Sequence, residues 1–330
     1  MTTWRRHALT AGAALGGAVL FVYAVRRAGV AEIVDGIRKV GWGLVPILAI
    51  AGARFLIRAC SWRLCMTPEM RLPLGQTFRA FLAGDAVGNI TPLGVAASEP
   101  TKFFLTRHRL ATHEAIASLA IDNLFYAASI VAVLIFSVIV MLLTVPLPLE
   151  WREGAAVALL VAAVAVAVAV RLLRGTWRGD GQRPAWRETL ASLRRSVLSF
   201  AATQPGRPLQ VFLLDLSFHA LAIIEVFMTL RWLLGDRSPT FSQAIVFEAL
   251  NRVVTVAFKF VPFRVGIDEA LSGAIAPMLA VQPAAGVTLA VVRKVRNLFW
   301  TAVGLALIAG RPDRAAPATG LPESEPGHRT

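Results

Sequence analysis

The sequence predicts an all-α polytopic membrane protein, with about six transmembrane helices and two re-entrant broken-helix hairpins in an inverted repeat. Of its 330 residues, 56% are hydrophobic and 16% are charged, a balance that does not fit a soluble domain. A helix of about 20 apolar residues crosses the hydrocarbon core of a bilayer. Uncharged stretches that approach or exceed this length include residues 8–25, 124–149, 154–170 and 270–292.

Five segments follow one another along the chain. The first holds a transmembrane helix, which we expect to be retained because Arg26 and Arg27 follow its apolar run in place of a cleavage site. An amphipathic helix on the outer interface comes next. An arginine-rich loop separates the two repeats, and the positive-inside rule places it in the cytoplasm. The segments are 1–41, the first repeat at 42–170 with its hairpin at 78–110, the basic loop at 171–208, the second repeat at 209–310 with its hairpin at 242–281, and a disordered cytoplasmic tail at 311–330.

An internal repeat is the most informative feature of the sequence. Residues 92–99 read PLGVAASE and residues 262–269 read PFRVGIDE, with Pro, Val and Glu in register. The stretch IDNLFY at 121–126 likewise resembles VRNLFW at 295–300. Because three crossings separate the starts of the two copies, the copies have opposite orientations in the membrane. The predicted helix breaks lie at Pro92 and Gly94 in the first hairpin and at Pro262 and Gly266 in the second.

Charged and amide side chains inside apolar segments are the candidate binding residues. A charged residue at the centre of a membrane helix costs about 2.5–3.5 kcal/mol on insertion scales, so it must be paired, hydrated or functional. A polar cavity between the repeats accounts for many such residues at once. Guanidinium groups donate two parallel hydrogen bonds to phosphate, so arginines lining that cavity would attract an anionic head group. The candidates are Arg54, Arg58, Arg293, Arg296, Asn89, Asn123 and Asn297, although the last two also suit a role in tying helices together.

Acidic residues near the hairpins are the candidates for coupling or gating. Glu99 and Glu269 each follow a break containing Gly, where the N-terminus of the next half-helix favours an anion. They either bind protons or cations in a transport cycle or accept backbone hydrogen bonds at a helix start. Asp122 and Arg296 are repeat equivalents, which also allows an ion pair between them. The full coupling or gating set is Glu99, Glu269, Asp122 and Asp268.

Several other function classes lack support in the sequence. The net charge of +14 could indicate nucleic acid, but the arginines lie beside or inside apolar segments, so anionic lipid is the expected counter-ion. Cys60 and Cys65 have neither a metal-binding nor a redox spacing. No Ser–His–Asp set, phosphate-binding loop or zinc-protease motif is evident. We therefore expect no enzyme activity, no metal, no cofactor and no nucleic-acid partner.

Three stretches carry a resemblance to a known family: RLPLGQTFRAFLAGDAVGNITPLG at 71–94, EPTKFFL at 99–105 and PFRVGIDE at 262–269. They resemble the flippase-like integral membrane family. That family includes the transmembrane region of lysylphosphatidylglycerol synthases and stand-alone relatives associated with hopanoid or polyprenyl-glycolipid pathways. The resemblance implies lipid translocation. The soluble aminoacyl-transfer domain of the synthases is missing from this sequence, so we expect no lipid aminoacylation by this chain.

The leading hypothesis is a flippase-like transporter of the bacterial inner membrane, with both termini in the cytoplasm. It would move a phospholipid or a lipid-linked anionic head group between leaflets, so membrane lipids are its expected partners, with a lipid-modifying enzyme as a further candidate. Two alternatives stay open. One is a carrier of hopanoid or another weakly charged lipid, which predicts that carboxylates occupy the arginines. The other is a non-catalytic accessory subunit of a glycolipid-synthesis enzyme.

Overall fold

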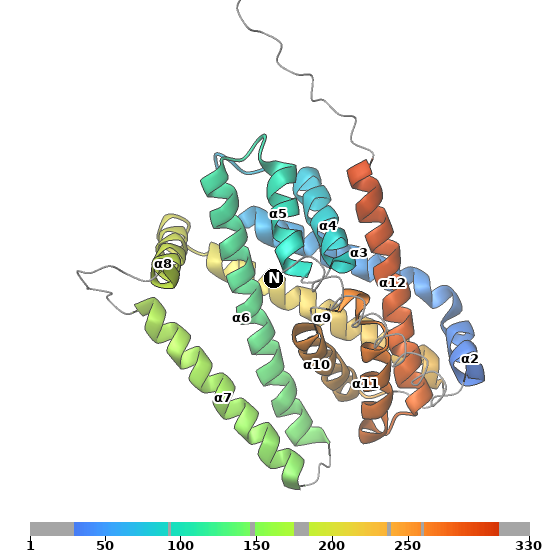
Figure 1. Cartoon of the computed structure of the whole chain (residues 1–330). Helices are drawn as coiled ribbons and strands as arrows, with labels where there is room; N and C mark the ends of the chain where they lie inside the picture. Colours follow the sequence, from blue (N-terminus) through green and yellow to red (C-terminus); the bar gives the residue numbers. More distant parts are fainter. Residues whose placement is uncertain are drawn as a thin grey trace, which may run out of the picture.

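The computed structural model describes residues 30–91, 94–145, 149–174, 185–235, 239–258 and 261–309, and all regular elements in them are helices (Figure 1). Three predicted features lie outside these residues: the first transmembrane helix at 8–25, the helix break at Pro92 and the tail at 311–330. The α-helices are α2 (Val30–Val40), α3 (Leu44–Leu64), α4 (Leu74–Ile90), α5 (Gly94–Thr106), α6 (Thr112–Thr144), α7 (Leu149–Arg174), α8 (Ala185–Thr203), α9 (Arg207–Leu234), α10 (Phe241–Ala257), α11 (Ile267–Ile275) and α12 (Pro283–Ala309). Three short 3-10 helices are η1 (Gly41–Gly43), η2 (Pro262–Arg264) and η3 (Ala276–Leu279).

Three helical stretches among the described residues are long and apolar enough to cross a membrane. They are Val34–Leu64, which runs from α2 into α3, then Thr112–Thr144 and Arg207–Leu234. These stretches confirm the predicted all-helical membrane protein. Helices α7 and α12 have 26 and 27 residues, which also exceeds the length of about 20 residues that a crossing needs. The count of six spans stays a prediction.

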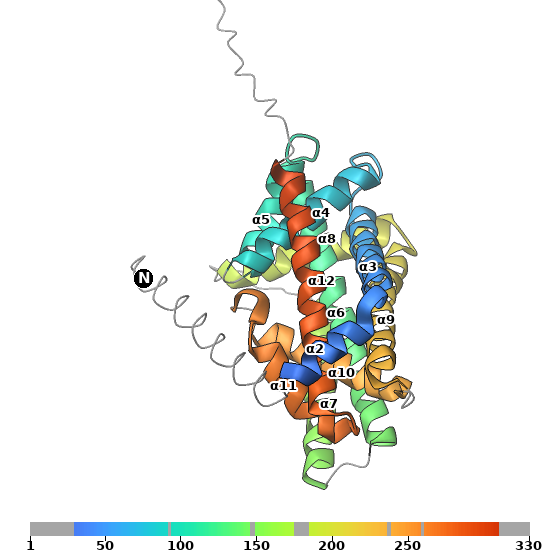
Figure 2. The same ribbon diagram turned by 90° about the vertical axis from the view of Figure 1, so that its right-hand side faces the viewer.

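The two halves of the chain have the same order of elements. A long helix, α3 or α9, is followed by a 17-residue helix, α4 or α10. After a break comes a shorter helix, α5 or α11, and then a second long helix, α6 or α12. This order agrees with the predicted duplication. The pair α4 and α5 lies in the upper half of the bundle and the pair α10 and α11 in the lower half, as both views show (Figures 1 and 2).

The halves pack against each other reciprocally. Helix α4 of the first half lies along α12 of the second, and α10 of the second half lies along α6 of the first. The two leading helices, α3 and α9, also pack together. The first hairpin helix of each half therefore packs against a long helix of the other half as well as against its own.

Glycines allow the closest helix contacts. A Cβ atom on Gly94 of α5 would lie 2.5 Å from the Gly88 carbonyl oxygen of α4, and one on Gly304 of α12 would lie 2.6 Å from the Leu82 carbonyl oxygen. Such distances are far below van der Waals contact, so only glycine fits while the backbones stay where they are. Small residues serve this purpose in membrane helices because lipid gives no hydrophobic drive for helix association. The first hairpin is thereby held closely against α12.

Helix α2 matches the amphipathic helix predicted in the connector before the first repeat. Its apolar residues Val30, Val34 and Ile37 are exposed. Gly36 faces the protein, where an added Cβ would lie 2.9 Å from Thr288 of α12. The exposed apolar stripe fits a helix lying on the membrane interface.

Helix α8 lies within the segment predicted as a basic loop, and sequence reasoning assigned no element there. Its side chain Phe200 is buried with Cys65, Ile121 and Val211, and Val197 packs against this cluster. The helix was not predicted because the many arginines of the segment outnumber the residues of its short apolar face. The loop is thus partly a helix attached to α6 and α9.

Replacing Gly304 with alanine should destabilise the protein. The new methyl group would force α12 away from Leu82 and Ala86 of α4, and overpacking of this kind costs about 1–3 kcal/mol. Gly154→Ala on α7 is the matched control, because nothing lies within 4 Å of its added Cβ. We expect thermal unfolding in detergent to show a lower Tm for Gly304→Ala only. Equal Tm values for the two variants would contradict the close contact.

Candidate functional site

Arg58 of α3 is the centre of a buried ion-pair cluster. Its guanidinium nitrogens lie 2.5 Å from an Asp215 carboxylate oxygen on α9 and 2.7 Å from an Asp122 oxygen on α6. Both aspartate side chains are 0% exposed. The Tyr126 ring centroid lies 4.2 Å from the guanidinium carbon, which adds a cation–π contact. One arginine thus pairs with two carboxylates from different helices.

Glu225 of α9 is the centre of a second cluster. Arg54 of α3 donates to one of its carboxylate oxygens at 2.9 Å, and Arg296 of α12 donates to the other. The Arg54 guanidinium also lies over the Phe218 ring, 4.4 Å from its centroid. Here two arginines share one carboxylate, the reverse of the arrangement at Arg58.

Glu248 of α10 forms the third cluster. Its oxygens lie 2.7 Å from Arg252, one turn later on the same helix, and 3.0 Å from Arg293 of α12. Arg252 also donates to the Tyr126 hydroxyl at 3.2 Å. Because Tyr126 contacts Arg58 as well, it connects the third cluster to the first.

The three clusters together neutralise most of the charge at the centre of the bundle. All five arginines have a carboxylate partner, and pairing offsets much of the cost of placing them in a membrane. The clusters join α3 and α6 of the first half to α9, α10 and α12 of the second. Five arginines share four carboxylates, and the members are Arg54, Arg58, Arg252, Arg293, Arg296, Asp122, Asp215, Glu225 and Glu248.

The ion pair that the repeat allowed between Asp122 and Arg296 does not form. Asp122 pairs with Arg58, and Arg296 pairs with Glu225. Helices α6 and α12 are not packed together, because α6 lies along α9 and α10 whereas α12 lies along α4 and α11. Each charge pairs instead with the leading helix of its own half, Asp122 with α3 and Arg296 with α9.

The three candidate asparagines bond other protein groups, one of them across the two halves. Asn89 of α4 donates to Asp85 at 3.0 Å and to Thr301 of α12 at 3.3 Å, so it ties the hairpin to the other half. Asn123 donates to the Leu119 carbonyl of its own helix. Asn297 accepts hydrogen bonds from the adjacent Arg296 and holds the guanidinium that reaches Glu225.

Glu269 in the second hairpin caps the N-terminus of α11. One of its oxygens accepts the Gly266 backbone N–H at 2.8 Å, and the other lies 2.5 Å from the Lys294 ammonium of α12. Gly266 has a φ of +84°, a conformation that favours glycine. Asp268 pairs instead with Arg264 at 3.2 Å. The geometry at Glu269 is the helix-start arrangement that the sequence left open as an alternative.

Glu99 in the first hairpin has a different environment from its repeat equivalent. It pairs with Lys102 on the same helix at 2.8 Å, and its side chain is 23% exposed. Its second carboxylate oxygen has no hydrogen-bond donor among the described residues. Lys102 also lies 4.3 Å from the Phe81 ring centroid. Of the four acidic candidates, Glu99 is the most accessible.

The clusters consist of ion pairs in which a carboxylate or an arginine is shared between two partners. Among the described residues, no group of three or more His, Cys, Asp or Glu side chains could hold a metal. Cys60 and Cys65 are free thiols. Where one carboxylate serves two arginines, an entering anion can bind one guanidinium while the other keeps its partner.

Sequence reasoning omitted several members of the clusters from the predicted site. Asp215, Glu225, Glu248 and Arg252 all lie in predicted apolar segments, and an intramembrane charge is itself the signal that could have included them. Tyr126 gave no such signal, because a lone tyrosine in an apolar helix is ordinary. Its role depends on two arginines from other helices.

Comparison with known families gives a match across both halves of the chain. The family model for the lysylphosphatidylglycerol synthase TM region matches residues 9–304. The chain belongs to this family. Comparisons with curated proteins and with solved structures give no match. Since the match contains all three charge clusters and both hairpins, membership in the lysylphosphatidylglycerol synthase TM family indicates a membrane lipid-related role for the helices described above.

Replacing Arg58 with methionine should strongly destabilise the protein. The change keeps most of the side-chain volume but leaves Asp122 and Asp215 buried without their shared cation, which costs about 3–5 kcal/mol. Thermal or denaturant unfolding in detergent measures the loss. Arg152→Met, at an exposed position of α7, is the control and should change stability by less than about 0.5 kcal/mol. Equal stability of the two variants would refute a structural role for the Arg58 cluster.

Proposed function

We propose that the protein is a transporter that moves a phospholipid or a lipid-linked anionic head group between the leaflets of the bacterial inner membrane. Its family membership supports a membrane lipid-related role. The proposal places both termini in the cytoplasm and lets the hairpins α4–α5 and α10–α11 enter the membrane from opposite sides. Two similar halves of opposite orientation are typical of transporters that expose one site alternately to each side.

The observation that carries this proposal is the set of charge clusters shared between the halves. Rocking of one half against the other must rearrange the contacts of Arg54 and Arg58 on α3 with carboxylates on α9. Arg293 and Arg296 on α12 pair with carboxylates of their own half, so they stay with α9 and α10 and compete with α3 for the shared partner. Arg54 and Arg296 share a single carboxylate, Glu225, so one guanidinium can turn to a phosphate at little cost. These four arginines are the proposed binding residues. Asn89, Asn123 and Asn297 position the helices and side chains around them.

Coupling is assigned to the acidic residues of the hairpins and of α6. Glu99 fits this role best, because it is partly exposed and one of its oxygens lacks a donor among the described residues. Asp122, Asp268 and Glu269 complete the proposed set. Each is paired with a basic side chain, so a change in its charge would release a cation inside the bundle.

A second candidate function has an observation in its favour. All four predicted binding arginines are paired with carboxylates, which is the arrangement expected for a carrier of hopanoid or another weakly charged lipid. In such a carrier the clusters would only hold the halves together. The lipid specificity of transport separates the two functions.

Purified protein in liposomes should move head-group-labelled phosphatidylglycerol between leaflets. Leaflet-accessibility quenching measures the movement, with phosphatidylethanolamine and a polyprenyl phosphate as comparison lipids. Glu99→Gln should reduce the rate by about 10-fold or more, because the proposed coupling group loses its charge. Glu150→Gln is the matched control, since Glu150 is exposed at the start of α7, and it should transport at the wild-type rate.

The outcome for the different lipids decides between the candidate functions. Movement of an anionic lipid that Glu99→Gln abolishes and Glu150→Gln preserves supports the transporter and the assignment of Glu99. Movement of no phospholipid by folded protein, with or without a pH gradient, would contradict the leading proposal. Transport of a hopanoid under the same conditions would then establish the second candidate.

A further inference from the structure

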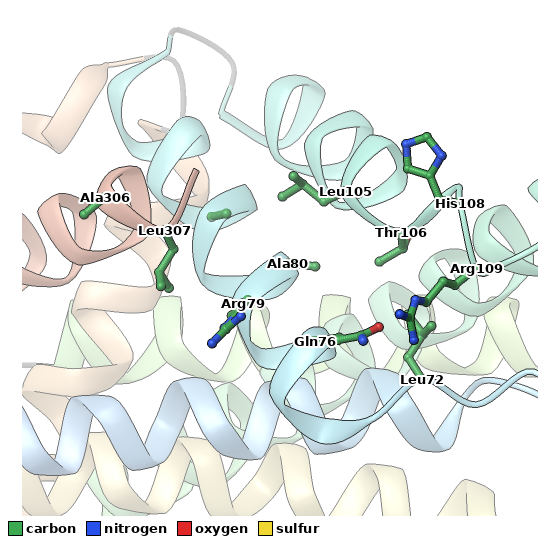
Figure 3. Close-up of a pocket in the computed structure, with 11 residues that line it drawn as sticks. Leu72, Gln76, Arg79, Ala80, Leu105, Thr106, His108, Arg109, Ala306 and Leu307 are labelled. Atoms are coloured by element: carbon green, nitrogen blue, oxygen red, sulfur yellow. The ribbon is translucent and has the colours of Figure 1, made fainter. Parts of the chain in front are cut away.

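A second, open site lies at one end of the bundle, apart from the three charge clusters. It is a cavity of about 480 Å³ between α4, the end of α5 and the end of α12 (Figure 3). This volume falls within the roughly 300–1,000 Å³ typical of small-molecule pockets. The lining residues are Leu72, Gln76, Arg79, Ala80, Ala83, Leu105, Thr106, His108, Arg109, Ala306 and Leu307.

Two lining arginines differ from those of the clusters. Arg79 of α4 and Arg109, just after α5, form no ion pair with any carboxylate among the described residues, and both are exposed. Gln76 points toward Arg109, and Arg79 lies on the same helix nearer Leu307, as the close-up shows (Figure 3). The cavity therefore presents two guanidinium groups and an amide with no counter-charge, which are the donors that bind phosphate.

The deeper wall of the same cavity is apolar. Ala80 and Ala83 line it further along α4 than Gln76, and Leu307 adds an apolar side chain from the end of α12. Seven residues of helix separate Gln76 from Ala83, which is a rise of about 10 Å along α4. A polar mouth and an apolar floor separated by this distance match the head group and the first acyl carbons of a phospholipid, whereas a soluble phosphate ester would leave the apolar wall uncovered.

The end of the bundle that holds the cavity is rich in basic residues. Arg63 donates to the carbonyl of Leu72, which lines the cavity, and Arg107 lies between the lining residues Thr106 and His108. Helix α8, with Arg194 and Arg195, follows α7 in the upper half of the view (Figure 1). By the positive-inside rule this end faces the cytoplasm, where anionic lipids are attracted to clustered arginines.

We propose that this cavity binds the phosphate head group of an anionic phospholipid from the cytoplasmic leaflet, through Arg79, Arg109 and Gln76. The inference deepens the proposed function, because it gives the lipid a binding place on the cytoplasmic side of the same transporter. Binding at this site is separate from movement across the membrane, so the two can be tested separately.

The test is lipid binding to the full chain in detergent, measured by native mass spectrometry with phosphatidylglycerol, diacylglycerol and inorganic phosphate as probes. We expect Arg79→Gln/Arg109→Gln to raise the Kd for phosphatidylglycerol by about 10-fold or more, since two charged donors are lost. Arg107→Gln is the matched control, because it removes a neighbouring charge that does not line the cavity, and it should change the Kd by less than about 2-fold.

Each outcome supports or overturns the site. Tight binding of phosphatidylglycerol, weak binding of diacylglycerol and of inorganic phosphate, and a loss confined to the double variant support a phospholipid site. Equal losses in the double variant and in Arg107→Gln would overturn it, as would inorganic phosphate binding as tightly as the lipid. Wild-type transport by a double variant that no longer binds lipid here would confirm the binding site but overturn its role as the lipid's binding place in the transporter. Intact binding without any transport would refute the transporter alone.

Discussion

A charged side chain inside a membrane must find a counter-charge, and this requirement determines how the two halves of the protein fit together. Arg58 reaches one carboxylate on α6 and another on α9, and Glu225 collects one arginine from α3 and another from α12. None of these partners lies on the helix of the residue that needs it. The charges can therefore be satisfied only when helices of both halves come together at matching depths.

Close helix packing makes those distances possible. In lipid, helices associate through van der Waals contact and polar interactions, because burial of apolar surface gains little. Gly88 and Gly94 bring α4 against α5, and Gly304 brings α12 against α4. If α12 moved outward by the width of a methyl group, Arg293 and Arg296 would move away from Glu248 and Glu225. The glycines and the ion pairs thus depend on each other.

The sequence predicted the helices and the duplication well because both are properties of local pattern. Apolar runs at 124–149 and 154–170 predicted α6 and α7, and the related motifs at 92–99 and 262–269 predicted the two breaks. Which carboxylate pairs with which buried arginine depends on which helices pack together in the fold. The spacing between the two copies of the repeat does not determine this packing. Asp122 and Arg296 are equivalent in sequence and still face different helices. The helix at 185–203 was missed because its apolar face is short beside its charges.

The exposed arginines around the open cavity could not be predicted as a site from the sequence. Arg79 and Arg109 are 30 positions apart, and only the turn between α4 and α5 brings them to one cavity. Their sequence neighbourhood resembles an ordinary solvated helix end. What distinguishes them from the buried arginines is the lack of a carboxylate partner in the described structure, together with an apolar wall below.

The most direct measurement of the pairing is a comparison of Glu225→Gln with the triple variant Arg54→Met/Glu225→Gln/Arg296→Met. Glu225→Gln leaves two buried guanidinium groups without a carboxylate, whereas the triple variant removes the orphaned charges as well. If buried charges hold the halves together by mutual neutralisation, thermal unfolding in detergent will show a Tm for the triple variant above that of Glu225→Gln. The mechanism would be contradicted if the triple variant lost as much stability as the three single substitutions lose when their separate losses are added, or more.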